Sequence, residues 1–412
     1  MKHNFIKKIK IKNFFSIKND VEIDFEADDY TIEHHKDRVF QYENRYYNKL
    51  ISLYGANASG KTSILKSLVV VGAIINNESS TNVPFSIKNK YAHANSKTEI
   101  SINFVLFINN IAQEFQYVLI LDSNKEKINY KISNEIVYII ENDKRVTFLN
   151  RKDKKVVIDM DNDTKTILFD NLKNTISTIK EFEIFDKERN ILPSIKMFLG
   201  YIPYLTNINS AFFTSFGIKE QDEERLMLDI VHDDNLKIFL SKFFKSIGLD
   251  IANIDVEFKL DDNNQVIGVK NILLYHDVDK NIPIEYKLES DGTKMLFKVL
   301  IDIYLAKQRG SILVIDELDS VLHAMIVPLL CKLAIDNNVQ LIYTTHNIYN
   351  MKFLYADEIY IIEKDNTHST KILEPKKQNN IKGYENFLIM YEENLLGGLP
   401  HFNNIFTKIE ND

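Results

Sequence analysis

The chain has 412 residues, 45% of them hydrophobic, which is enough for a sizeable core in two or three domains or in one large domain with an insertion. Its net charge of -7 at pH 7 and its pI near 5.9 argue against a nucleic-acid coat or a histone-like role, although a local basic groove is compatible with both values. The single cysteine, Cys331, excludes an internal disulfide and a cysteine-based zinc site, so we expect a cytoplasmic protein. The first residues lack the apolar core of a signal peptide, and the longest apolar run, residues 68–75, is too short to span a bilayer, so we expect no membrane segment.

The first half of the chain predicts strands and then helices. Apolar and polar residues alternate over residues 6–25, which predicts a β-hairpin, and the polar and aromatic stretch after it predicts a loop with a short helix. Residues 50–54 are typical of a short buried strand, and the apolar spacing of residues 61–75 indicates a helix. Residues 99–158 contain long strand-like runs separated by turn residues, which predicts a meander, and residues 164–250 are helical in pattern.

The second half of the chain predicts an α/β section that follows further strands over residues 254–288. It has no internal repeat and no low-complexity tract. The predicted elements of this section are helices at residues 290–307, 321–336 and 349–354 and strands at residues 311–315, 341–344 and 358–362.

Residues 55–62 read Gly-Ala-Asn-Ala-Ser-Gly-Lys-Thr and match the phosphate-binding pattern G-x-x-x-x-G-K-[ST]. A chance match in a glycine turn is disfavoured, because the segment follows a predicted strand and opens a predicted helix. The backbone N–H groups and the positive end of the helix then favour phosphate. We expect Lys61 to reach the β- and γ-phosphates of ATP and the Thr62 hydroxyl to ligate Mg²⁺. The predicted nucleotide-binding residues of this segment are Gly55, Asn57, Ser59, Gly60, Lys61, Thr62 and Ser63.

Two other apolar strands end in residues suited to catalysis. Residues 311–317 end in Asp316 and Glu317, and such a strand forms the second half of a P-loop nucleotide site, with Asp316 on Mg²⁺ through its water shell and Glu317 on the attacking water. Residues 341–346 end in His346, which in isolation is more typical of a surface or core histidine. Its place after the acidic strand predicts a sensor of the γ-phosphate. The predicted catalytic residues are Glu317, Lys61 and His346, and the predicted metal ligands are Thr62 and Asp316.

A serine-glycine loop precedes the helix that leads to the acidic strand. Residues 289–294 read Glu-Ser-Asp-Gly-Thr-Lys, and a serine at a helix start followed by glycine exposes a group of backbone N–H donors. An ordinary helix cap is the alternative interpretation. The predicted nucleotide contacts of this loop are Ser290, Gly292 and Thr293.

The order of these motifs resembles the ABC-type ATPase superfamily. The pair Leu322-His323 after the acidic strand is typical of the branch that contains RecF and the OLD (overcoming lysogenization defect) proteins, whereas transporters usually have Asp where His323 stands. Residues 10–17 are similar to the start of that branch, and the stretch 383–400 is similar to its end. The nearest resemblance is to bacterial AAA-family ATP-binding proteins of abortive-infection and anti-phage systems, a group that includes the ATPase subunit of PARIS.

This resemblance implies an α/β fold, namely an ABC-type P-loop ATPase head with an antiparallel β-lobe and a helical insertion. It also implies that two heads sandwich two ATP molecules, so that the Ser290 loop of one subunit completes the Lys61 site of the other. We therefore expect a homodimer or a higher oligomer built from such dimers, with ATP and Mg²⁺ as cofactors. The implied divisions are an N-terminal ATPase half with the phosphate loop (1–98), the β-lobe (99–163), the helical insertion (164–253) and a C-terminal ATPase half with the signature loop, the acidic strand and the switch histidine (254–412).

The chain departs from its relatives in two ways. Too few residues follow His346 for the Toprim nuclease domain of the OLD nucleases, and residues 99–288 lack the sustained heptads of a long DNA-embracing coiled coil. The glutamine of the ABC Q-loop has two weak candidates, Gln113 and Gln116.

Three functions are compatible with these features. The first is an ATPase that hydrolyses ATP slowly and acts as sensor or regulator of a separate effector, such as a nuclease, in anti-phage defence. The second is a DNA-maintenance ATPase of the RecF or SMC type, which binds DNA in an ATP-dependent manner. The ATP-binding subunit of a transporter is disfavoured by the signature loop and by His323.

Several weaker features have ordinary structural interpretations. The clusters His34-His35 and 232–234 are more typical of solvated loops than of metal sites. The charged run 151–155 predicts a hairpin turn that faces solvent, with a nucleic-acid contact as the alternative. The aromatic stretch 192–216 favours core packing over a partner groove, and Cys331 is interpreted as a buried small residue.

Overall fold

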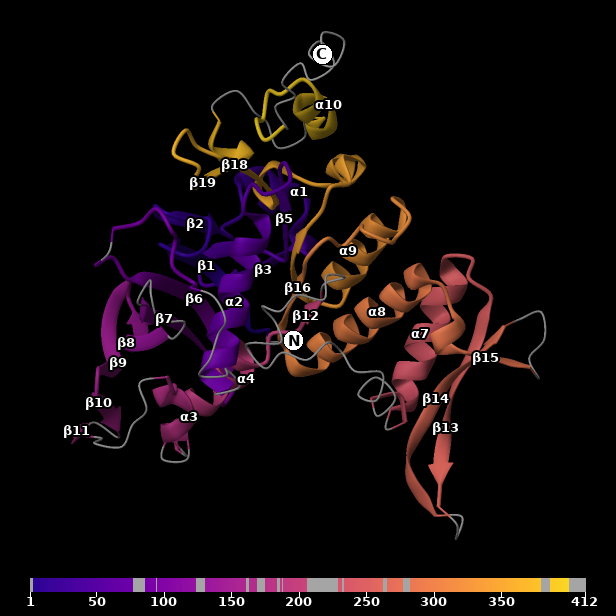
Figure 1. The fold of residues 1–412 in the computed structure, drawn as a ribbon, viewed down its shortest axis with the longest axis horizontal. Coiled ribbons are helices and arrows are strands. Elements are labelled where there is room, and N and C mark those ends of the chain that lie inside the picture. Colours follow the sequence, from indigo (N-terminus) through magenta and orange to yellow (C-terminus); the bar gives the residue numbers. More distant parts are fainter. Residues whose placement is uncertain are drawn as a thin grey trace, which may run out of the picture.

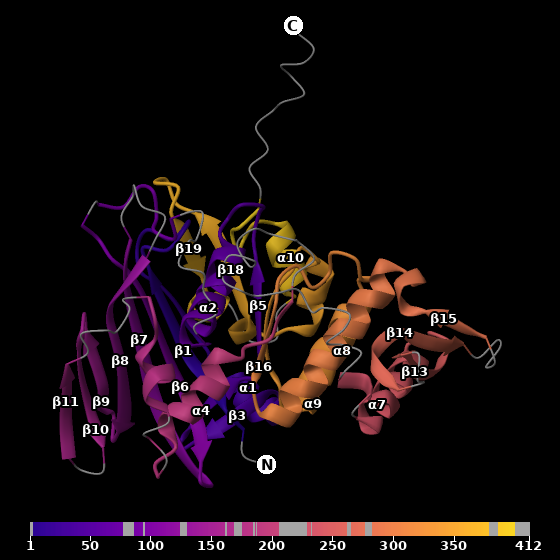
Figure 2. The ribbon, with the colours of Figure 1, turned by 60° about the horizontal axis from the view of Figure 1, so that its bottom comes forward.

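The computed structural model describes residues 3–76, 86–93, 95–123, 130–160, 163–168, 175–183, 186, 188–205, 229–231, 233–261, 265–276, 282–378 and 386–399. Figure 1 shows three parts beside one another: a curved sheet in indigo and magenta, a central α/β layer, and a lobe of helix and strands in salmon on the opposite side. The turned view in Figure 2 keeps this order. Across the described ranges, no helix is both long and apolar enough to cross a membrane.

The curved part is an antiparallel sheet whose described strands follow the order β11-β10-β9-β8-β7-β6-β1-β2. Its strands are β1 (Phe5–Lys12), β2 (Val21–Asp24), β6 (Thr98–Ile108), β7 (Ile111–Ser123), β8 (Tyr130–Glu141), β9 (Lys144–Lys152), β10 (Lys155–Met160) and β11 (Asp163–Leu168). Asn109 and Asn110, and likewise Asn142 and Asp143, have positive φ, as two-residue hairpin turns require. The predicted hairpin and the predicted meander are both confirmed.

The N-terminal hairpin and the meander belong to one sheet. Ile9 and Ile11 of β1 lie opposite Ile102 and Ile100 of β6, and all four side chains are buried. The boundary expected at residues 98 and 99 therefore falls at the start of β6, inside a continuous sheet, because these buried isoleucine pairs join the two segments.

The predicted loop after the first hairpin contains more structure than the sequence indicated. The short helix is present as α1 (Asp29–His34), followed by the 3₁₀ turn η1 (Lys36–Arg38), but β3 (Val39–Tyr42) and β4 (Arg45–Asn48) then form a second hairpin. Phe40 and Tyr47 are cross-strand partners, and the Phe40 ring stacks on Phe5 at 5.0 Å between centroids. Burial of these aromatic side chains stabilises the hairpin, and this contact is invisible to local periodicity.

The central layer is a mostly parallel sheet, with its described strands in the order β12-β16-β17-β5-β18-β19. Only β19 runs antiparallel to its neighbour, β18. The strands are β5 (Leu50–Tyr54), β12 (Tyr204–Leu205), β16 (Ile312–Ile315), β17 (Gln340–Thr344), β18 (Ile359–Lys364) and β19 (Thr370–Leu373). The strands predicted for the α/β section are confirmed, and the sheet adds two strands that the sequence did not reveal, β12 and β19.

Alternate residues of the central strands face two separate hydrophobic cores. On one face Ile51, Leu53 and Ile342 pack with helix α2 (Lys61–Asn76) and the curved sheet. On the other face Leu50 and Leu341 pack with helices α8 (Asp291–Arg309) and α9 (Ile326–Asp336). Because both faces are covered, the central strands are largely apolar, as expected for a parallel sheet.

The helices predicted between residues 164 and 250 lie in two different places. Helices α3 (Thr178–Phe182) and α4 (Ile191–Gly200) pack beside α2 in the first core. Helix α7 (Asp234–Ser246) belongs to the second core and packs on the small sheet of β13 (Ile251–Leu260), β14 (Val266–His276) and β15 (Pro283–Glu285). The helices of the expected insertion, residues 164–253, thus belong to two different cores.

Two helix boundaries in the second half differ from the prediction. Helix α9 begins at Ile326 and not at residue 321, because Pro328 has no backbone N–H and fits only within a first turn. The predicted helix 349–354 is the 3₁₀ segment η4 (Ile348–Phe353). The remaining short elements are η3 (Tyr286–Leu288), η5 (Ala356–Glu358), η6 (Pro375–Lys377) and α10 (Phe387–Glu392).

Candidate functional site

The phosphate loop joins the end of β5 to the start of α2, as the motif requires. Its two glycines are positions where no side chain fits. A Cβ atom on Gly55, which has φ +143°, would lie 2.0 Å from the Ile362 carbonyl oxygen, and one on Gly60, which has φ +117°, would lie 2.1 Å from Thr370 Oγ1. The loop is also held from the C-terminal side, because the Ala56 N–H donates to the Gly398 carbonyl oxygen at 3.1 Å.

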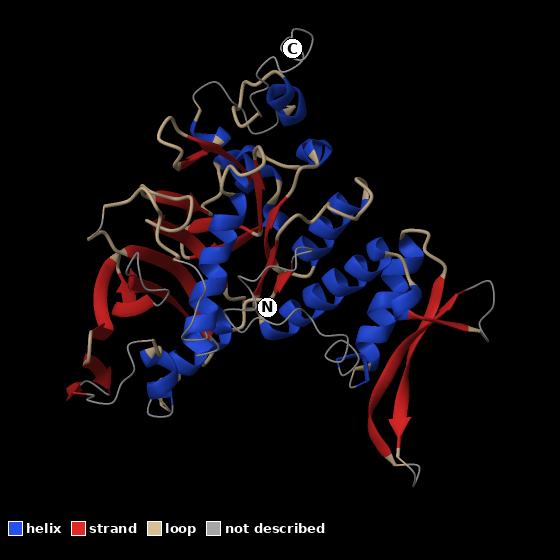
Figure 3. Ribbon diagram, viewed as in Figure 1, coloured by secondary structure: helices blue, strands red, loops and turns tan. Residues whose placement is uncertain are grey.

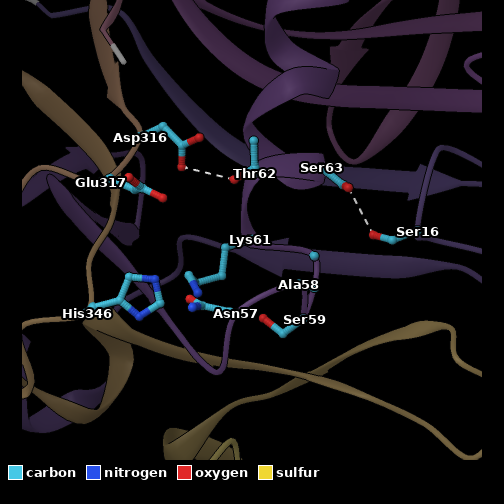
Figure 4. Close-up of a pocket in the computed structure, with 11 residues that line it drawn as sticks. Ser16, Asn57, Ala58, Ser59, Lys61, Thr62, Ser63, Asp316, Glu317 and His346 are labelled. Carbon is cyan, nitrogen blue, oxygen red and sulfur yellow. Dashed lines mark hydrogen bonds between the residues drawn. The ribbon is translucent and has the colours of Figure 1, made fainter. Parts of the chain in front are cut away.

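A pocket opens above this loop, and Figure 4 shows the side chains that face it. It unites almost all of the predicted residues of the three motifs: the phosphate loop, the acidic strand and the histidine strand. Of the predicted residues of these motifs, Gly55 does not line the pocket. Ser16 and Ala58 line it, although the sequence did not predict them. The lining residues are Ser16, Asn57, Ala58, Ser59, Gly60, Lys61, Thr62, Ser63, Asp316, Glu317 and His346.

The loop has free hydrogen-bonding capacity for phosphate. The N–H groups of Lys61 and Thr62 at the start of α2 have no acceptor among the described residues, whereas those of Ser63 and Ile64 donate to the Gly60 carbonyl oxygen. The Ser59 hydroxyl is buried without a hydrogen-bond partner among the described residues. Phosphate oxygens are acceptors that satisfy such donors, and the helix end adds a favourable potential. The residues present therefore fit a nucleotide phosphate.

Lys61 is buried against its own loop. Its ammonium donates to the carbonyl oxygens of Gly55 at 2.7 Å and Ala56 at 3.1 Å, which leaves one of its three N–H donors for a ligand. Burial lowers the pKa of Lys61 below its usual value, although the carboxylates of Asp316 and Glu317 oppose the shift. Negative phosphate oxygens would offset the cost of burying this charge.

Asp316 is the most densely bonded residue of the pocket. Its Oδ1 accepts from Thr344 Oγ1 at 2.6 Å and from Thr62 Oγ1 at 3.2 Å, and its Oδ2 accepts from the Tyr204 hydroxyl at 3.2 Å. Neighbouring oxygen ligands of an octahedral Mg²⁺ lie about 3 Å apart, and hard oxygen donors are what this ion prefers. The Thr62 and Asp316 oxygens have both the chemistry and the separation to hold Mg²⁺.

Glu317 has a strained backbone that turns its carboxylate into the pocket. Its φ of +55° lies in the left-handed region, which non-glycine residues rarely adopt. The conformation is held by its N–H, which donates to Thr344 Oγ1 at 2.7 Å. Figure 4 shows the Glu317 carboxylate beside Asp316 and across from Lys61.

His346 lies on the same side of the pocket as Glu317, beside Lys61 and Asn57 in Figure 4. Its backbone N–H donates to both carboxylate oxygens of Asp319 at 3.2 Å, which ties the histidine strand to the turn after the acidic strand. Burial, together with the positive charge of Lys61, lowers the pKa of His346. The neutral imidazole is therefore favoured near pH 7, and it can donate one N–H to a phosphate oxygen.

The predicted signature loop lies apart from the pocket of its own chain. Ser290 caps α8, because the Thr293 N–H donates to its Oγ at 3.1 Å. Within its own chain the loop is therefore an ordinary helix cap, which was the alternative interpretation. Ser290 is exposed, and Gly292 lies so close to the turn after Glu317 that a Cβ on it would be 2.9 Å from the Val321 carbonyl oxygen. None of Ser290, Gly292 and Thr293 lines the described pocket.

Several weaker predictions are resolved by position. Gln113 and Gln116 lie on β7 and do not line the pocket; Gln116 Nε2 donates to Ser101 Oγ at 2.9 Å within the sheet. The charged run 151–155 is a hairpin turn as predicted, but Arg151 is fully buried and donates to the Asp153 and Ile176 carbonyl oxygens. Cys331 is buried, as predicted.

No metal site is found at the histidine clusters in the part of the chain that the structure describes. His34 and His35 contact the Tyr30 ring, and His35 also stacks on Tyr355 at 4.2 Å. His232 lies outside the described residues, as do Gly383, Tyr384, Pro400 and much of the aromatic stretch 192–216.

Residues that support the site without lining it come from places that the motifs do not mark. Thr344 precedes the histidine by two residues, and Tyr204 lies in the two-residue strand β12, for which the sequence has no recognisable pattern. A polar residue at the end of an otherwise apolar strand is the signal that identifies Thr344 in hindsight. Ser16 lies within the N-terminal segment that resembles the RecF branch.

The arrangement of sheet, phosphate loop and acidic strand defines a P-loop ATPase head of the ABC type. A crystal structure described as the SmcHead bound to the C-winged helix domain of ScpA has this fold, with a TM-score of 0.51, 14% identity, and coverage of 90% of this chain and 97% of that chain. A structure of the recombination mediator RecF-ATPrS in the RecFOR pathway matches with a TM-score of 0.38 and 12% identity, and covers 87% of this chain and 98% of that one.

The family follows from the sequence match. Residues 50–351, which are well over half of the chain, match the model of the family described as "AAA domain, putative AbiEii toxin, Type IV TA system". The chain belongs to this family. No curated protein matches it.

The contacts of Asp316 generate a prediction about Thr344. Thr344→Val keeps the shape but removes the hydroxyl that bonds both Asp316 Oδ1 and the Glu317 N–H. A hydrogen bond to a charged group contributes about 1.5–3 kcal/mol, so we expect the gain in ADP affinity that Mg²⁺ produces to fall about tenfold. Calorimetric titration of ADP with Mg²⁺ and with EDTA measures this gain.

Thr345→Val is the matched control. Thr345 is equally buried and adjacent, but its hydroxyl accepts from the Asn347 N–H and does not contact Asp316. An equal loss in both variants, or none in Thr344→Val, would show that the Thr344 hydroxyl does not organise the metal site.

Proposed function

We propose that this protein binds ATP with Mg²⁺ and hydrolyses it slowly, and that it acts as a sensor or regulator of a separate effector. The observation that carries the proposal is the single pocket in which Lys61, Thr62, Asp316, Glu317 and His346 face one another. These residues come from three separate strand ends, and together they supply a phosphate cradle, metal ligands, a carboxylate for water and a donor for the terminal phosphate.

The chain's residues would divide the reaction as follows. Lys61 and the first N–H groups of α2 hold the β- and γ-phosphates. The Thr62 and Asp316 oxygens hold Mg²⁺, which when bound neutralises charge on the phosphate oxygens. Glu317 accepts a hydrogen bond from the attacking water and aligns it in line with the leaving ADP oxygen. His346 donates to the γ-phosphate. Catalysis then rests on positioning and charge stabilisation.

A second copy of the chain is the proposed source of the remaining contacts. The Ser290 loop does not line its own pocket, yet it is exposed and lies against the turn that follows Glu317. Two exposed apolar residues lie next to it: Leu288, just before it in the chain, is 71% accessible, and Val321, in the turn that it contacts, is 42% accessible. Such side chains gain stability when covered. A two-fold dimer would place each Ser290 loop over the partner's ATP, so that ATP controls assembly.

A separate effector in anti-phage defence is supported by the family. The family description names a toxin and a toxin–antitoxin system, and such a system has a second component. The absence of a spanning helix in the described residues and the single cysteine support a cytoplasmic location.

A DNA-maintenance role is the second candidate, favoured by the likeness of the fold to the SMC head. The two candidates differ in what happens when the purified chain meets nucleic acid. The regulator role predicts no cleavage of DNA or RNA by this chain alone. The second role predicts DNA binding that requires ATP and weakens with salt, which an electrophoretic mobility assay at low and high salt measures. Lack of binding at low salt with ATP would count against DNA maintenance, and unaided cleavage would count against the regulator role.

The roles of Glu317 and Lys61 are separable by mutation. Glu317→Gln should reduce hydrolysis by about two to three orders of magnitude while ATP stays bound, because the side chain acts on water and not on the nucleotide. It should also increase the dimer fraction seen by analytical ultracentrifugation with ATP. Lys61→Ala should weaken ATP binding itself. Normal turnover in Glu317→Gln would refute the assignment.

Complementation tests whether the site is shared between two subunits. Lys61→Ala destroys a chain's own pocket, whereas Ser290→Arg should block the partner's pocket, so each variant alone should be inactive. An equal mixture should regain about a quarter of the wild-type ATPase activity, because half of the dimers are mixed and each contains one intact site. A mixture that stays inactive, or a Ser290→Arg variant with normal activity, would exclude a shared site.

A further inference from the structure

Thr370, the first residue of β19, lies directly behind the phosphate loop. It is almost fully buried, and its hydroxyl donates to the Ser59 carbonyl oxygen at 2.9 Å. The same hydroxyl oxygen is 2.8 Å from Ser16 Oγ, and Lys364 Nζ donates to it at 3.4 Å. A hydroxyl has one donor proton and two acceptor positions, so these contacts use the full capacity of the group.

Ser16 extends this contact to the other end of the loop. The hydroxyls of Ser16 and Ser63 are also hydrogen-bonded to each other at 2.9 Å, as Figure 4 shows, and the Thr370 N–H donates to the Ser16 carbonyl oxygen at 3.0 Å. Ser59 lies just before the helix and Ser63 lies in its first turn. The hydroxyl groups of Thr370 and Ser16 therefore form hydrogen bonds on both sides of Gly60, to Ser59 and to Ser63. This segment carries the N–H groups that face the expected phosphate position.

Gly60 lies between these two contacts, at Ser59 and Ser63, and Thr370 occupies the space that a side chain at Gly60 would need. A Cβ on Gly60 would be 2.1 Å from Thr370 Oγ1 and 2.8 Å from Ser16 Oγ. The Thr370 hydroxyl thus packs against the bare backbone of the loop without lining the pocket, whereas Ser16 reaches the pocket lining. Their contact fixes the direction of the peptide units at Ser59 and Gly60.

The β18–β19 hairpin does not need this hydroxyl for its own structure. Four ladder pairs join the strands, from Ile361 with Leu373 to Lys364 with Thr370. The turn is closed by Asp365, whose Oδ1 accepts from the N–H groups of Thr367 at 2.8 Å and Ser369 at 2.9 Å. The Thr370 hydroxyl is directed away from these contacts, toward Ser59 and Ser16.

We propose that Thr370 is a positioning residue of the nucleotide site, which holds the phosphate loop in its binding conformation before a nucleoside di- or triphosphate arrives. A preorganised loop spends less of the binding energy on ordering its own backbone. The hydroxyl acts through Ser59, Gly60 and Ser16, and it does not contact the ligand. This inference rests on the proposed binding of ATP.

The test compares Thr370→Val, which keeps the shape, with Thr370→Ser, which keeps the hydroxyl, in the full chain. The probe is ADP with Mg²⁺, titrated by calorimetry. We expect the ADP dissociation constant to rise about tenfold in Thr370→Val and to stay within about twofold of wild type in Thr370→Ser. In ATP hydrolysis the KM should rise while kcat changes little, since the hydroxyl is remote from the reacting water.

Ser369→Ala is the matched control from the same hairpin. Ser369 Oγ accepts from the Lys18 N–H at 3.0 Å and makes no contact with the phosphate loop, so its loss should leave ADP binding unchanged. If Thr370→Val lowers the melting temperature of the nucleotide-free protein below the assay range, Thr370→Ala, which cannot clash, replaces it and should show the same rise.

Each result is decisive. Normal ADP affinity in Thr370→Val and Thr370→Ala, or an equal loss in Ser369→Ala, would overturn the role of Thr370 while wild-type binding keeps the proposed function intact. A wild-type protein that binds neither ADP nor ATP would overturn the proposed function itself, and this inference with it.

Discussion

The parallel pairing of β16, β17 and β5 is the constraint on which the site depends. Val314 pairs with Ile342, and Ile342 with Ile51, so the three strands end at the same edge of the sheet. The residues that follow each strand end are then neighbours, whatever their distance along the chain. This is why the acidic pair, the histidine and the phosphate loop meet at one edge of the sheet. The pairing of buried apolar strands thus sets the positions of the residues that line the pocket.

Asp316 joins the two halves of the molecule at that edge. Its oxygens are bonded to Thr62 in α2, Thr344 in β17 and Tyr204 in β12. Helix α2 packs in the first core, and the apolar residues of the central strands face both cores. The Asp316 carboxylate therefore lies where the two cores meet. Because it is buried, its orientation is set by these hydroxyl donors and not by solvent. The orientation of this carboxylate is thereby set by parts of the chain that have no motif in common.

The sequence predicted the parts of the protein that depend on local pattern. Strand and helix periodicity identified the meander and the α/β order, and the motifs identified Lys61, Thr62, Asp316, Glu317 and His346, which share one pocket. It did not reveal β12, which has two residues, or the Phe40–Tyr47 hairpin, which depends on packing against Phe5. The sequence also identifies the glycines of the phosphate loop but not the residues that contact them. The partners of Gly55 and Gly60, Ile362 and Thr370, lie hundreds of residues away and follow from tertiary structure alone.

The remoteness of these partners has a consequence for how the protein is made. The hydroxyl that holds Ser59 lies 311 residues further along the chain, and the carboxylate beside Thr62 lies 254 residues further. At ribosomal rates of about 5–20 residues per second, the phosphate loop would wait about 15–60 seconds for Thr370 to be synthesised. A nascent N-terminal half thus carries the complete phosphate-loop motif but not the contacts that shape its ATP site. The loop therefore acquires these contacts only after β19 has been synthesised.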